Sequence, residues 1–110
     1  MPELVDVATN AGDRLRELGQ TKVAISCYLA AWRAAPLNEA PLWRLAEACL
    51  ADHAVDQAVG YLQRITDLMR ARGDDEGAIT VYRRIATIAP DNKEVREVLR
   101  HLHATGRLLD

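Results

Sequence analysis

The chain has 110 residues, of which 49% are hydrophobic and 27% charged, and its net charge is -2 at pH 7. This length can bury a hydrophobic core without disulfides, and the charge balance excludes a strongly basic surface for nucleic acid. No run of roughly 18 apolar residues predicts a membrane span, and the first residues lack the basic and apolar regions of a signal peptide. We expect a cytoplasmic protein in which Cys27 and Cys49 stay reduced.

Apolar residues recur at helical spacing from the N-terminus, where a helix is predicted over about 3–18 and ends at Gly19. A second predicted helix covers about 21–34 and ends before Pro36, because proline cannot continue a helix. A third covers about 39–51. The expected inward-facing residues of the first helix are Leu4, Ala8, Ala11, Leu15 and Leu18.

The second half of the chain continues the same pattern. A long helix is predicted over about 55–72 and ends at Gly73, and two more follow over about 75–88 and 92–105. No segment alternates as a strand does. Short loops bring successive helices together antiparallel. The sequence therefore predicts an all-α fold of about six antiparallel helices.

One set of residues has counterparts 34 positions later in the chain. A period of this length is typical of stacked helical hairpins. Small residues such as Gly12 and Ala24 let two helices approach closely, and Tyr28 fills the space beside them. The set is Gly12, Ala24, Tyr28 and Ala31, and the counterparts are Ala46, Ala58, Leu62 and Ile65.

These residues, with Gly19 at the turn and Pro36 after the second helix, resemble the tetratricopeptide repeat (TPR) family. The resemblance implies a right-handed solenoid of helical hairpins that forms a single domain over residues 1–110, in which the last helix acts as a cap. The matching segments are a first repeat at 5–38, a second at 39–72, an overlapping third match at 59–92, and a capping helix and tail at 92–110.

The third match is displaced from the regular spacing, because it starts 20 residues after the second rather than 34. The helix predicted over about 55–72 therefore fits the pattern twice, as the second helix of one hairpin and the first of the next. His53 also stands where the family usually has a turn glycine. Whether the shared helix lines or backs the solenoid groove is left open.

The resemblance places a partner-binding groove along the helices predicted over about 3–18 and 39–51. Trp43 is the leading candidate contact, because an exposed tryptophan in a groove is a strong interface anchor. The alternative is that Trp43 packs against a neighbouring helix as part of the core, where Trp32 is also expected. The predicted partner-binding residues are Thr9, Asp13, Arg16, Trp43, Glu47 and Leu50.

One TPR subclass holds the free C-terminal carboxylate of chaperones with basic and amide side chains. The resemblance maps these clamp positions onto Thr9, Asp13 and Arg44, none of which matches the clamp. Asp13 would also repel a carboxylate. We therefore do not expect this ligand.

No catalytic, cofactor or metal site is predicted. His101 and His103 are two residues apart, so a helix would point them in nearly opposite directions. The chain has no nucleophile elbow and no glycine-rich phosphate loop. Acidic residues interleave with the later arginines, which indicates a salt-bridged surface rather than a nucleic-acid site.

These observations favour a non-enzymatic scaffold that binds another protein or a peptide in the groove. The alternative is a homodimerisation module of a larger signalling or secretion protein, acting through the helix over about 92–105 or the Leu108 and Leu109 tail. Nucleic-acid binding is disfavoured, and no membrane contact is expected.

Overall fold

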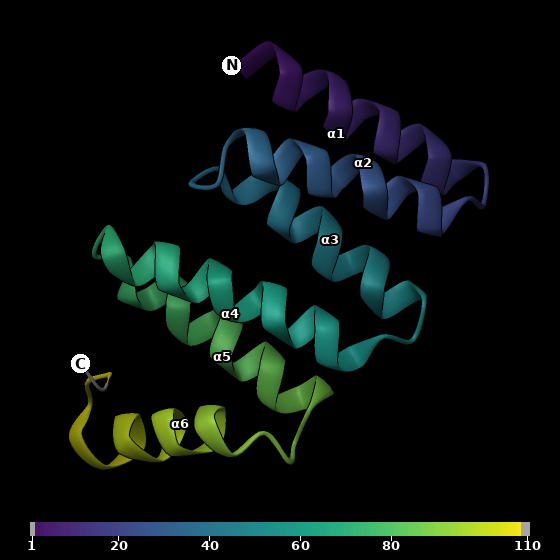
Figure 1. The fold of residues 1–110 in the computed structure, drawn as a ribbon. Helices are drawn as coiled ribbons and strands as arrows, with labels where there is room; N and C mark the ends of the chain where they lie inside the picture. The colour runs from purple at the N-terminus through teal and green to yellow at the C-terminus, as the bar shows by residue number, and fades with distance from the viewer. Residues whose placement is uncertain (1, 109–110) are drawn as a thin grey trace. The chain divides into compact units, whose positions relative to one another are not determined.

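The computed structural model describes residues 2–108, with side chains from Leu4 onward. In this range the chain forms helices and no strands (Figure 1). The predicted all-α class is confirmed, and each predicted helix is found with ends that differ by at most one residue. The helices are α1 (Pro2–Glu17), α2 (Thr21–Ala34), α3 (Glu39–Ala51), α4 (Val55–Ala71), α5 (Asp75–Ile88) and α6 (Lys93–Thr105).

The chain divides into two compact units whose boundary falls inside α4. The N-terminal unit ends at Tyr61 and contains α1, α2, α3 and the first turns of α4. The C-terminal unit begins at Leu62 and contains the rest of α4 with α5 and α6. That both units fold as one domain stays a prediction.

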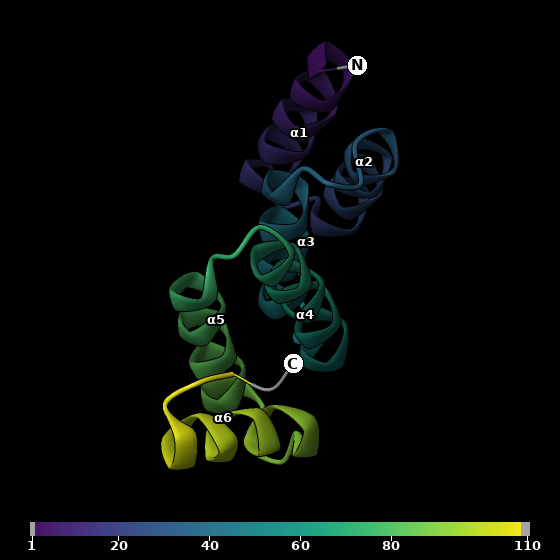
Figure 2. The same ribbon diagram turned by 90° about the vertical axis from the view of Figure 1, so that its left-hand side faces the viewer.

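In the N-terminal unit, α1 packs against α2 and α3, and α2 packs against α3 (Figures 1 and 2). The ring of Tyr28 is fully buried in this core. Gly12 lies against it so closely that an added β-carbon would be 2.8 Å from Tyr28 Cδ1. The absent side chain at Gly12 is therefore what lets α1 approach α2, as the sequence pattern predicts.

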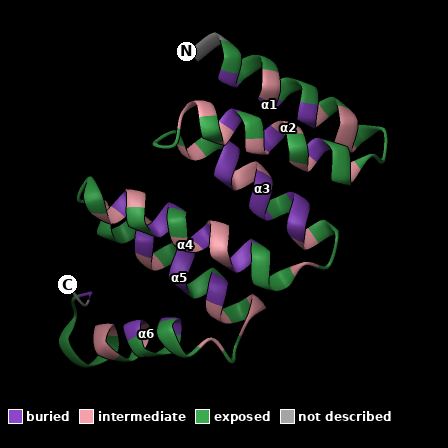
Figure 3. Cartoon of the chain, in the orientation of Figure 1, coloured by how far each residue is buried: buried purple, intermediate pink, exposed green. Residues whose placement is uncertain are grey.

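The prediction of which α1 residues face the core is wrong. Leu4 is 55% exposed and Leu18 is 71% exposed, whereas Val5, Thr9 and Gly12 face the core. Figure 3 shows buried positions interspersed with exposed ones along the helices. The buried arc is turned about 100° from the predicted one, which corresponds to one residue along the helix. The close contact at Gly12 fixes this orientation, because only a glycine fits beside the Tyr28 ring.

Three turns share one backbone conformation. Gly19 and Gly73 each have φ of 81°, and His53 has φ of 60°. In each turn the following amide donates to a carbonyl five residues earlier, as Ala54 N does to Cys49 O at 2.8 Å. His53 therefore takes the left-handed conformation that glycine adopts without cost.

The remaining interhelical loops are of a second kind. The α2–α3 loop contains Pro36 and ends at Asn38, whose side chain accepts a hydrogen bond from the Ala40 amide at 3.0 Å. The α5–α6 loop contains Pro90 and ends at Asn92, whose side chain caps α6 by accepting a hydrogen bond from the Val95 amide. Turns of the glycine type thus occur on both sides of α4, with no proline loop beside it. The overlapping repeat match at 59–92 stays a prediction.

In the C-terminal unit, α5 packs against α6. The helix α6 is amphipathic, with Val95 and Val98 buried on one face and Arg96, Glu97 and Arg100 exposed on the other. The chain turns at Gly106, which has φ of 75°, and Leu108 is buried beyond it. Leu109, the other residue of the predicted docking tail, lies outside the described residues.

Candidate binding surface

Two ion pairs join α1 to α3 in the N-terminal unit. Arg44 Nε donates to Asp13 Oδ1 at 3.0 Å, and Arg16 Nη1 lies 3.6 Å from Glu47 Oε2. Asp13 and Arg16 are three residues apart on α1, and Arg44 and Glu47 are three apart on α3, so each helix presents its pair on one face. All four side chains remain partly exposed. Three of the predicted site residues, Asp13, Arg16 and Glu47, therefore come together.

Asp13 is also tied to the core. The Tyr28 hydroxyl donates to Asp13 Oδ1 at 2.6 Å, so this oxygen accepts from both Tyr28 and Arg44. Burial of the phenol, and then its hydrogen bond to Asp13, raise the pKa of Tyr28 to about 12. One carboxylate thus links α1, α2 and α3 beneath the exposed surface.

Trp43 lies on α3 beside these ion pairs and is half-buried. Its indole Nε1–H donates to Glu39 Oε1 at 3.0 Å, one turn earlier on the same helix. Leu50, the last residue of the predicted set, is also half-buried. The hydrogen bond to Glu39 orients the indole ring of Trp43, and the ring stays partly accessible. Trp43 is therefore intermediate between a fully exposed contact residue and a core residue.

Thr9 differs from the other predicted site residues. It is only 9% exposed, and its hydroxyl donates to the Val5 carbonyl at 2.7 Å. The orientation of α1 set by Gly12 turns Thr9 toward the core, so its side chain is not part of the exposed surface.

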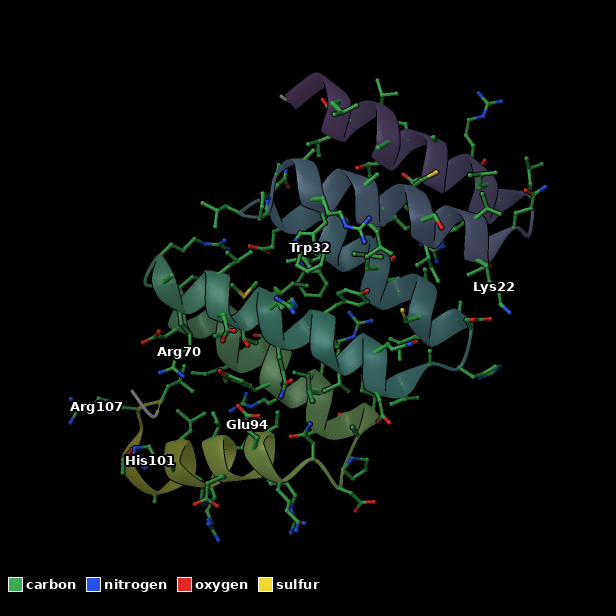
Figure 4. The ribbon with its side chains drawn as sticks, viewed as in Figure 1. Lys22, Trp32, Arg70, Glu94, His101 and Arg107 are labelled. Carbon is green, nitrogen blue, oxygen red and sulfur yellow. The ribbon has the colours of Figure 1, made fainter. Side chains whose placement is uncertain are left out.

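Trp32, which the sequence places in the core, is half-buried (Figure 4). Its ring meets that of Tyr61 edge to face, with centroids 6.1 Å apart and an angle of 87° between the planes. Tyr61 was not among the residues predicted for the core or for the binding site. The two residues are 29 positions apart, so no helical spacing connects them.

Two arginines of the C-terminal unit pair with neighbouring acids. Arg72 lies 3.5 Å from Asp74, and Arg100 pairs with Glu97 one turn earlier on α6. A shallow hollow of about 470 Å³ lies on α6 next to this second pair. Its lining mixes both charges with Leu99, so it does not form a purely basic site.

Within residues 2–108, no cluster of three or more histidine, cysteine or acidic side chains could hold a metal ion. Over the same residues, every helix is too short or too polar to cross a bilayer. Cys27 and Cys49 are both free thiols.

No family model matches the sequence, and no curated protein is significantly similar to it. Solved structures do match. The first TPR of Spaghetti (RPAP3) bound to the HSP90 peptide SRMEEVD is 21% identical, with a TM-score of 0.56, over 93% of this chain and 92% of that one. The NMR structure of the first TPR domain of human RPAP3 is 23% identical, with a TM-score of 0.45, over 94% and 93%. The first likeness shows the fold, and the second is too weak to add to it. The chain therefore has the tetratricopeptide repeat fold that its sequence resemblance predicts.

Proposed function

We propose that this chain is a protein-interaction scaffold that binds a peptide or helix of another protein on the face shared by α1 and α3. The TPR fold supports a binding role, since the similar RPAP3 domain is described with an HSP90 peptide bound. The observation that carries the proposal is Trp43, a half-buried aromatic ring next to polar groups held in fixed positions. Tryptophan is enriched among the residues that dominate binding energy.

The surface around Trp43 is organised before a ligand arrives. The Asp13–Arg44 and Arg16–Glu47 pairs connect the two helices, and the buried Tyr28 hydroxyl fixes Asp13 from below. Each exposed ion pair contributes little to stability. Their effect on binding is to reduce the side-chain ordering that association must otherwise impose.

The charges at this face indicate the chemistry of the ligand. The surface carries three carboxylates and two guanidinium groups. They belong to Asp13, Glu39, Glu47, Arg16 and Arg44. The face is thus not cationic. It differs in this respect from a surface built to hold an acidic terminus such as that of SRMEEVD. We propose a ligand that anchors an apolar side chain on Trp43 and carries no net negative charge.

The test is a selection of binding peptides from a displayed library, followed by affinity measurements with variants. Trp43→Ala should weaken the selected peptide more than tenfold, about 1.4 kcal/mol, while circular dichroism shows unchanged helicity. Leu37→Ala is the matched control, because Leu37 is 83% exposed in the α2–α3 loop. Unchanged affinity in Trp43→Ala would contradict the proposal. Unfolding of that variant would place Trp43 in the core and contradict it too.

Self-association through α6 or the C-terminal tail is the second candidate. Val95, Val98 and Leu108 are buried, so α6 and the described part of the tail offer little apolar surface to another copy. Leu102 is half-buried and is the residue to change. If the chain is dimeric and Leu102→Glu alone makes it monomeric without loss of helicity, this second candidate replaces the first.

A further inference from the structure

The N-terminal unit exposes an apolar stripe on α1 that the proposed binding surface does not use. Leu4 and Val7, which is 66% exposed, lie on it, and Leu18 continues it in the turn directly after the helix. Val23, near the start of α2, is also exposed, at 51%. Isolated exposed apolar residues are normal, but a contiguous stripe on one helix marks an interaction surface.

The stripe has a symmetric spacing. We define the outer α1 stripe as Leu4, Val7, Ala11, Leu15 and Leu18, whose successive separations are 3, 4, 4 and 3 residues. Leu15 is half-buried and the other four are exposed. The sequence of separations reads the same from either end. A second α1 helix running antiparallel therefore places Leu4 opposite Leu18, Val7 opposite Leu15, and Ala11 opposite the Ala11 of the other copy.

We propose that the outer α1 stripe is a homodimer interface in which two copies of α1 pack antiparallel across a two-fold axis at Ala11. A two-fold interface uses the same patch on both copies, so the patch must complement itself. This one does, because the small side chain sits at the centre, where the helix axes come closest. The larger side chains flank it on both sides.

The charges of α1 agree with this arrangement. At about 100° per residue, Asp6, Asp13 and Glu17 fall on an arc well away from the outer α1 stripe. Among the charged residues of α1 whose side chains the structure describes, Arg14 is the one at the stripe's border. None of these residues forms a like-charged pair between the apolar side chains. The arc that carries Asp13 and faces α3 also remains free for the ligand proposed above, so the two proposals stand independently.

The first test is the mass of the full chain by light scattering as a function of concentration. We expect a dimer at roughly 100 µM, because one helix from each copy, with five apolar side chains, makes an interface at the low end of specific contacts. Leu18→Glu should raise the dimer dissociation constant more than tenfold without loss of helicity, since Leu18 is 71% exposed. Leu37→Glu, the same change at a residue outside the stripe, should leave the dimer intact. A monomeric wild-type chain at that concentration, as expected if the stripe binds a different protein, would overturn the proposal.

The second test reads the orientation of the helices. Cys27 is first replaced by alanine to remove the half-buried native thiol. Ala11→Cys should then give a disulfide-linked dimer on mild oxidation, because the two copies of this residue meet at the axis. Leu4→Cys should not link to itself, since its two copies are about 21 Å apart, but should link to Leu18→Cys in a mixture. Efficient self-linking of Leu4→Cys would contradict the antiparallel interface.

Discussion

Gly12→Ala is a substitution for which helix propensity and packing predict opposite results. In the interior of a helix, alanine is more favourable than glycine by roughly 0.5–1 kcal/mol, so propensity alone predicts stabilisation. The structure predicts the reverse. An added β-carbon would be 2.8 Å from Tyr28 Cδ1 and 2.9 Å from Tyr28 Cζ, closer than carbon atoms approach without strain.

The Tyr28 ring cannot easily move aside to make room. It is fully buried, and its hydroxyl is hydrogen-bonded to Asp13 at 2.6 Å. Overpacking of a well-packed core costs typically about 1–3 kcal/mol. Gly60→Ala supplies the matched control, because Gly60 lies within α4 and a β-carbon there would meet nothing within 4 Å. Both glycines belong to the N-terminal unit, so both variants report on the same part of the fold.

We expect Gly60→Ala to gain about 0.5–1 kcal/mol and Gly12→Ala to lie about 1–3 kcal/mol below it in the free energy of unfolding. Urea denaturation followed by circular dichroism measures both values. In a Tyr28→Ala background the difference between the two substitutions should disappear, since the contact that causes it is gone. If Gly12→Ala is as stable as Gly60→Ala in the native background, the close approach of α1 to α2 is not as described.

Three other predictions follow from the turns, the caps and the buried phenol. His53→Gly should raise the free energy of unfolding by about 1 kcal/mol in urea denaturation, because φ of 60° is unfavourable for histidine; a loss would contradict the turn geometry. Asp74→Ala should lower the melting temperature, at a cost of about 1 kcal/mol, since Asp74 accepts a hydrogen bond from the Gly77 amide at 2.9 Å; an unchanged melting temperature would contradict this cap. The pKa of Tyr28 is raised to about 12, above the ordinary value of about 10 for an unfolded chain. The stability this phenol contributes should therefore be intact below about pH 10 and lost between about 10 and 12. Phenolate absorbance, compared with a Tyr28→Phe variant, measures this, and titration of Tyr28 near its ordinary pKa would contradict it.

The helices were predictable because their ends are marked by local signals. Glycine at Gly19 and Gly73, and the prolines Pro36 and Pro90, fall at the observed ends. The resemblance to the repeat family also predicted that Tyr28 fills the space beside Gly12, and the structure has the Tyr28 ring against Gly12.

The orientation of α1 was not predictable, because two neighbouring arcs of that helix are apolar. One contains Leu4, Ala11 and Leu18, and the other contains Val5 and Gly12. Hydrophobicity favours the arc with the larger side chains. The fit between Gly12 and Tyr28, which is a matter of shape, selects the other.

The candidate surface was predictable only in outline. The repeat register predicts Trp43 and Glu47, one turn apart, on one side of α3. The bonds that Asp13 accepts come from residues 15 and 31 positions away, on two other helices. Such contacts depend on how three helices meet, and no spacing within one helix indicates them.

The most direct test of the proposed function is amide and indole chemical-shift mapping of the full chain with a peptide selected on it. We predict that the largest changes occur at the Trp43 indole and at Arg16 and Glu47, on the face shared by α1 and α3. Changes confined to α5 and α6, with the Trp43 indole unmoved, would contradict the account.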